Sequence, residues 1–181
     1  DSTLSQENAM SQTRPSTSNP LSRLQQELSS YVGYETVSAR KQSDQCLRTR
    51  LLDIIHDIDT ELETIPGVEG LANRQRWQRE FDNTRRKLTL ISASLEDPEY
   101  EDEAFFRDAN LPASRIQELY HHEWILLHHL RSLLAEICSS KTEASSDSGE
   151  DIFIRIENLI DGFNQSLFER EALIISNTIV E

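Results

Sequence analysis

Residues 77–95 read WQREFDNTRRKLTLISASL. Large side chains recur in this stretch at alternating spacings of four and three residues, with one threonine among them: Trp77, Phe81, Thr84, Leu88, Ile91 and Leu95. Residues with that spacing share one face of an α-helix, and such a stripe is the seam along which a helix packs lengthwise against others. This stretch therefore predicts a long amphipathic helix inside a helical bundle.

Three other segments of the chain carry apolar stripes of the same kind. They cover about residues 43–64, from 110–114 to 138, and 150–175. A shorter stripe follows Asn19-Pro20, which reads as a helix N-cap with proline at the first helical position. The sequence thus predicts an all-α fold, namely an antiparallel helical bundle of four long helices plus a short N-terminal helix laid across it.

Two features refine this architecture. Pro66-Gly67 ends the second predicted helix, and so short a connection makes the second and third helices an antiparallel hairpin. Gly162 interrupts the last predicted helix at a cost of ~1 kcal/mol relative to alanine, so it permits either a close helix approach or a bend.

Polar segments divide the chain into a tail and one domain. Residues 1–18 are rich in Ser, Thr and Gln and too polar to bury a core, so we expect a disordered tail followed by a single helical domain over 19–181. Within the domain we expect an acidic linker at 96–109, anchored by Phe105 and Phe106, and a Ser-rich linker at 139–149. Ser5, Ser11 and Ser148 are candidate phosphorylation sites or simply parts of flexible segments.

The charge of the chain restricts its partners. The 181 residues carry a formal charge of -14, so phosphate backbones and anionic lipid are repelled, and we expect no nucleic acid or membrane partner. No stretch approaches the ~20 apolar residues of a membrane span. Two cysteines, Cys46 and Cys138, are too few for a disulfide framework and predict free thiols in a reducing, cytoplasmic compartment. The first residue is Asp, which suggests a piece of a larger protein.

The histidines are the most tempting metal ligands. Residues 121–129 read HHEWILLHH, but two histidines bind one ion on a helix only when they are three or four residues apart, and here the separations are one, six, seven and eight. A second pattern pairs Asp53-x-x-His56 with Glu118-x-x-His121, as in di-iron bundles. Both pairs lie opposite the apolar stripes and are expected to face solvent. We therefore expect no metal site.

Catalytic signatures are equally scarce. The five glycines are scattered, so there is no Gly-rich phosphate loop, and no nucleophile elbow or HExxH motif occurs. The sequence therefore predicts no enzyme, no catalytic residues, no cofactor and no small-molecule substrate.

A basic segment and one tryptophan are the candidate contact residues. The segment has a local excess of cations, at Arg74, Arg76, Arg79, Arg85, Arg86 and Lys87. It either pairs within the chain, for instance with the acids of 96–103, or binds an acidic protein partner, to which arginine is well suited. Trp124, between His121 and His128, is either a core residue or an interface anchor.

Long helices with 4-3 spacing, Ser-rich linkers, and Trp77 and Trp124 on successive long helices resemble the helical modules of eukaryotic cytoskeletal scaffolds. Spectrin-type repeats and centrosomal coiled-coil proteins are the nearest comparisons, and the resemblance covers residues 43–175 in character. It implies a scaffold or adaptor in the cytoplasm, at cytoskeletal or centrosomal structures. We therefore expect a protein–protein interaction or self-association module. A metal-binding or enzymatic bundle and a secreted cytokine-like four-helix bundle are the alternatives.

Overall fold

A computed structural model describes residues 19–64, 74–100, 103–107, 111–143 and 149–175, with the side chains of all of these except 74–77, 141–143 and 149–151. These residues form five α-helices and one 3-10 turn, with no strand among them. The elements are α1 (Pro20–Glu27), α2 (Val37–Glu63), α3 (Arg74–Glu96), η1 (Ala104–Phe106), α4 (Ala113–Glu143) and α5 (Gly149–Ile175). The all-α prediction is confirmed.

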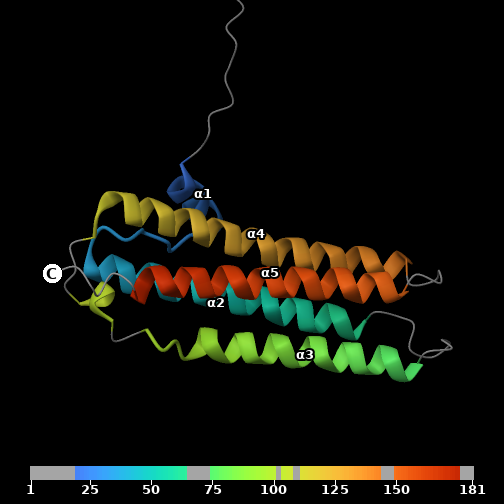
Figure 1. The fold of residues 1–181 in the computed structure, drawn as a ribbon. Helices are drawn as coiled ribbons and strands as arrows, with labels where there is room; N and C mark the ends of the chain where they lie inside the picture. Colours follow the sequence, from blue (N-terminus) through green and yellow to red (C-terminus); the bar gives the residue numbers. More distant parts are fainter. Residues whose placement is uncertain (1–18, 65–73, 101–102, 108–110, 144–148, 176–181) are drawn as a thin grey trace, which may run out of the picture.

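The four long helices lie lengthwise beside one another, and α1 lies on α4 (Figure 1). Arg48, early in α2, bonds to the carbonyl of Leu95 at the end of α3, whereas Arg85 of α3 pairs with Asp59 late in α2. These two helices therefore run in opposite directions. Among the described helices α3 contacts α2 and α5, so it forms an edge of the bundle.

The predicted start of α1 is confirmed. Asn19 is the N-cap, its side chain accepts a hydrogen bond from the backbone N–H of Leu21, and Pro20 is the first helical residue. The chain then turns at Gly33, whose φ of 95° is a conformation that favours glycine. The hydroxyl of Ser43 fixes this turn, because it accepts from the N–H of Gly33 and donates to its carbonyl.

Helix α2 begins six residues before the Ser43 start that we expected. Thr36 caps it by accepting from the N–H of Ala39. In the first two turns of α2, the side chains of Arg40, Ser43 and Asp44 face inward and are buried. Because these side chains are polar, an apolar stripe does not mark this part of the helix.

Helix α4 reaches Glu143, so the Ser-rich linker is shorter than predicted at its N-terminal end. The hydroxyls of Ser139 and Ser140 donate to the carbonyls four residues earlier, those of Ala135 and Glu136. Both hydroxyls are thus satisfied within the helix, and the helix runs through the two serines, which their polarity had not suggested.

The acidic segment is partly built into the core. Phe105 and Phe106 of η1 are buried, as is Tyr100. The predicted anchoring by the two phenylalanines is therefore confirmed. The 1–18 tail, the Pro66-Gly67 turn, and Ser148 lie outside the described residues.

Gly162 does not mark a close helix approach. A Cβ added to it would meet no heavy atom within 4 Å.

Candidate functional site

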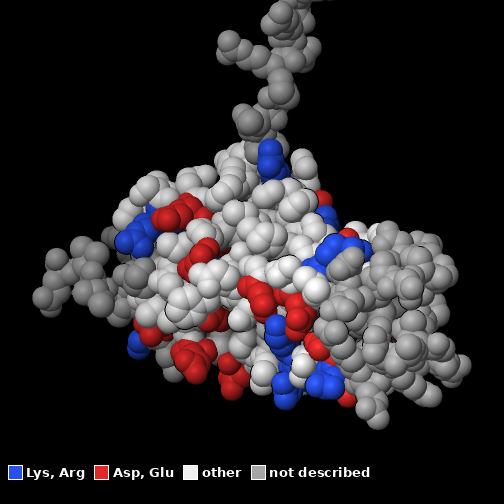
Figure 2. Space-filling model, turned by 45° about the vertical axis from the view of Figure 1, so that its right-hand side comes forward, with Lys and Arg blue, Asp and Glu red and all other residues white. Residues whose placement is uncertain are grey.

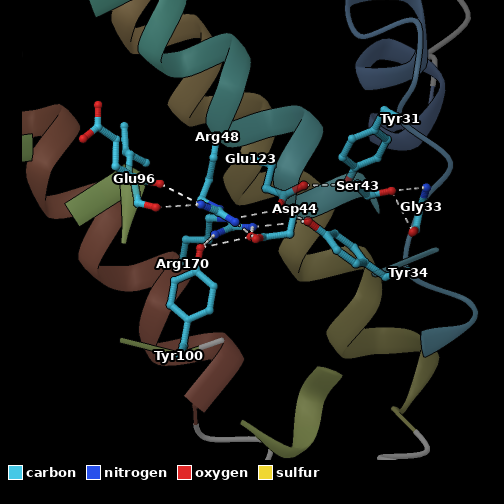
Figure 3. Close-up of polar contacts among 11 residues, drawn as sticks. Tyr31, Gly33, Tyr34, Ser43, Asp44, Arg48, Glu96, Tyr100, Glu123 and Arg170 are labelled. Atoms are coloured by element: carbon cyan, nitrogen blue, oxygen red, sulfur yellow. Dashed lines mark hydrogen bonds and ion pairs between the residues drawn. The ribbon is translucent and has the colours of Figure 1, made fainter. Parts of the chain in front are cut away.

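A buried guanidinium stands at the centre of the bundle. Arg170 of α5 donates from Nε to Oε1 of Glu123 on α4 at 2.8 Å and from Nη2 to Oδ1 of Asp44 on α2 at 2.6 Å (Figure 3). The three side chains are 1%, 0% and 4% exposed. A third bond runs from Nη1 to the hydroxyl of Tyr100, 2.8 Å away. One side chain thus joins three helices and the segment after α3.

Tyrosine hydroxyls satisfy the remaining acceptors of this cluster. Tyr31 and Tyr34, from the segment between α1 and α2, each donate to the carboxylate of Glu123. Tyr100 donates to Oδ1 of Asp44 at 3.0 Å. Arg48 donates to Oδ2 of Asp44 at 2.9 Å, so two guanidinium groups balance two carboxylates.

Burial and charge act in opposition on these groups. Burial raises the pKa of Glu123, although Arg170 and the two hydroxyls partly counteract it. Burial by itself would lower the pKa of Arg170, but the acidic and phenolic groups around it hold that pKa well above the ordinary value. Buried charges are costly unless each is paired, and in this network every charged group has a partner of opposite sign. Because the ion-paired side chains have almost no exposed surface, the cluster holds helices together rather than presenting a charge to a ligand.

The sequence contained a signal for this cluster that its apolar stripes obscured. Glu123 falls within the 4-3 series of α4 that Ile116, Tyr120 and Leu127 define. Asp44 and Arg170 occupy such positions in their own helices. Charges of opposite sign on the core faces of separate helices indicate a buried pair.

The predicted orientation of the carboxylate–histidine pairs is confirmed. Asp53, His56, Glu118 and His121 all have exposed side chains. Among the described residues, no group of three or more His, Cys, Asp or Glu is placed to hold a metal ion.

A serine–histidine contact occurs between α5 and α4. Ser166 Oγ lies 3.3 Å from Nδ1 of His129 and donates to the carbonyl of Gly162 at 3.0 Å. The serine oxygen is therefore shared between the carbonyl of its own helix and the imidazole of α4, and the contact joins the two helices.

Of the predicted contact residues of α4, Trp124 lies beside α1. His121 and His128 are exposed, and Trp124 is half-buried. Its ring packs against the core on one side, and the Arg23 guanidinium lies 5.6 Å from the ring centroid. Trp124 is therefore partly a core residue, and its role as an interface anchor stays a prediction.

The basic segment is divided by pairing within the chain. Arg85 donates two hydrogen bonds to Asp59 at 2.7 Å, and Lys87 bonds to Asp161 at 2.9 Å. For Arg85 and Lys87 the acids therefore come from α2 and α5, whereas we had expected the acids of 96–103 or of a partner. Arg79 and Arg86 are exposed, and the side chains of Arg74 and Arg76 lie outside the described set. On the face that Figure 2 shows, Lys and Arg side chains lie among Asp and Glu side chains.

An apolar surface that the sequence analysis did not single out lies between α3 and α5. An open hollow of about 300 Å³ separates the two helices, lined by Lys87, Leu90, Ile91, Ser94, Ile160, Asp161 and Asn164. Leu90 is 67% exposed, and Phe168, one turn beyond Asn164, is 66% exposed. We call this surface the α3–α5 groove.

No protein-family model, curated protein or solved structure matches this chain. In the described part of the chain, no helix has both the length and the apolar character needed to cross a bilayer.

Proposed function

We propose that this chain is a non-enzymatic protein–protein interaction or self-association module of a larger intracellular scaffold or adaptor protein, acting at cytoskeletal or centrosomal structures. The observation that carries the interaction role is the α3–α5 groove, where Leu90 and Phe168 leave large apolar surfaces in water beside a hollow. Exposed apolar side chains beside a concavity are typical of surfaces that bind another protein. The location rests on the resemblance of the helices to scaffold modules.

The interior supports a binding role. The Arg170–Glu123–Asp44 cluster is fully buried and fixes α2, α4 and α5 relative to one another. A rigid body presents its outer helix faces with little ordering cost, which favours association. Both cysteines are free thiols, so the disulfide that would favour a cytokine-like secreted bundle is not formed.

Two measurements test this function. Light scattering of the purified chain reports self-association. Photo-crosslinking in the cells that make the protein, with benzoylphenylalanine in place of Leu90 or Phe168, detects a protein bound at the groove. We expect either a dimer or a discrete crosslinked protein from both groove positions. Val32, 46% exposed and outside the groove, is the control position and should give neither. A monomer without a groove-specific crosslink would contradict the proposal, as would stoichiometric bound metal.

A further inference from the structure

We infer that the α3–α5 groove binds a basic amphipathic helix of a partner protein. This inference rests on the proposed function and names the class of partner. It is argued from the exposed apolar residues, the course of the two helices and the charges on either side of the groove.

The exposed apolar residues are concentrated on two helices. Five large apolar side chains of the described residues are strongly exposed, and four of them belong to α3 and α5: Leu90, Ile154, Phe168 and Ile175. The three on α5 are spaced by fourteen and seven residues, so they share one flank of that helix, with Asp161 between the first two. Exposed apolar residues that share one flank of a surface helix are typical of a face that another helix covers.

Helices α3 and α5 lie side by side, so a docked helix could lie along both of them. Lys87 of α3 pairs with Asp161 of α5, and Tyr100, four residues after the end of α3, bonds to Arg170, later in α5, so α3 and α5 run in the same direction. Ile91 and Ile160, 6% and 1% exposed, lie at the base of the hollow between them. From Ile154 to Ile175 the α5 stripe extends about 31 Å at ~1.5 Å per residue. A docked helix of about six turns would cover it.

The charges select the occupant. On the groove side of α5, Glu157, Asp161 and Glu171 recur at spacings of four and ten residues, close to the apolar stripe. Lys87 is the facing cation of α3, and it is already shared between Glu157 and Asp161. The α5 edge therefore keeps excess negative charge, which a lysine- or arginine-bearing helix would complement.

The α3 edge adds a second requirement. Arg86, one turn before Leu90, is exposed and bonded to Asn83. A partner helix that faces this edge would place an acidic or neutral residue there. A second copy of this chain fits the groove less well, since it would bring two bodies of formal charge -14 together.

The test uses two labelled probe peptides and the full 181-residue chain. Each peptide has three heptads, with leucine at positions a and d. One carries lysine at e and g, and the other carries glutamate there. Fluorescence anisotropy at 0.15 M salt measures both affinities. We expect the lysine probe to bind at least tenfold more tightly than the glutamate probe, with an affinity that falls as salt increases.

Variants locate the binding site. Leu90→Ser and Phe168→Ser should each weaken the lysine probe at least tenfold, and Asp161→Asn should weaken it less. Val32→Ser, the matched change outside the groove, should leave it unchanged. Circular dichroism and thermal unfolding should show that the exposed positions tolerate the changes without loss of fold.

Four outcomes overturn the inference. If the glutamate probe binds as tightly as the lysine probe, the groove does not select a basic helix. Binding that Phe168→Ser leaves intact would place the site elsewhere. A dimer that Phe168→Ser converts to a monomer would make a second copy the occupant, and the proposed function would then stand while this inference fails. If neither probe binds, the inference also fails, and the crosslinks from positions 90 and 168 decide the proposed function separately.

Discussion

Arg170 of α5 and Glu123 of α4 form an ion pair in which Nε lies 2.8 Å from Oε1 and the two side chains are 1% and 0% exposed. A pair this deep in a bundle fixes how far α5 is shifted along α4, because any slip would leave both charges buried without partners. The same guanidinium also contacts Asp44, so the position of α2 depends on it too.

The first prediction removes this guanidinium. Arg170→Met leaves two buried carboxylates without their shared partner and should lower the free energy of unfolding by about 3–5 kcal/mol. Urea denaturation followed by circular dichroism measures the change.

Arg155→Met is the matched control. Arg155 also joins α5 to α4, through Glu136 at 2.6 Å, but the two side chains are 44% and 27% exposed. Its loss should cost less than about 1 kcal/mol. Equal effects of the two substitutions would contradict the stabilising role of the buried pair.

The second prediction concerns a buried hydroxyl. Thr84 of α3 is 0% exposed, and its Oγ1 has no hydrogen-bond partner among the described residues. Thr84→Val replaces that hydroxyl with a methyl group of similar size and should stabilise the fold by about 1 kcal/mol, because the desolvation penalty disappears. Thr89→Val is the control on the same helix, since its exposed hydroxyl donates to the carbonyl of Arg85. A destabilised Thr84→Val variant would show that the hydroxyl has a partner.

Local patterns predicted the helices, whereas contacts between distant segments could not be predicted. The stripe from Leu88 to Leu95 and the Asn19-Pro20 start depend on neighbours within one or two turns, so the sequence suffices for them. The early start of α2 depends on Arg40 and Asp44 turning inward. Arg40 meets the carbonyl of Phe105, and Asp44 meets Arg170, which is 126 residues away in sequence.

The groove shows the same division. Leu90 and Phe168 both lie off the apolar stripes of their helices, so their exposure follows from periodicity. Their common surface does not, because α3 and α5 are not consecutive and their packing depends on which helix edges the bundle leaves adjacent. The pairing of Arg85 and Lys87 could not be predicted for a related reason: Asp59 and Asp161 reach them across helix contacts.

The third prediction uses two glycines with opposite surroundings. Gly162→Ala should raise the free energy of unfolding by about 0.5–1 kcal/mol, since the new Cβ meets open space and alanine favours the helix. Gly33→Ala should lower the free energy of unfolding by more than about 1 kcal/mol, because the substitution is strained. Its φ is 95°, and a Cβ there would lie 2.7 Å from the hydroxyl oxygen of Tyr120. Chemical denaturation of both variants checks the signs, and a shared sign would contradict this account of the two sites.

The fourth prediction concerns pH. Burial, with a smaller contribution from the neighbouring His128, lowers the pKa of His129 below its usual value. The unfolded chain therefore binds a proton more readily than the folded chain, and the fold loses stability as pH falls through about 6.5, the ordinary pKa of histidine, toward the folded pKa. The His129→Gln variant lacks the pH-dependent contribution of this histidine to stability. The difference in free energy of unfolding, wild type minus variant, should decrease from pH 8 to pH 5.5 in urea titrations at constant ionic strength. A difference that stays constant or grows on acidification would show that the packing of His129 against α5 does not favour its neutral form.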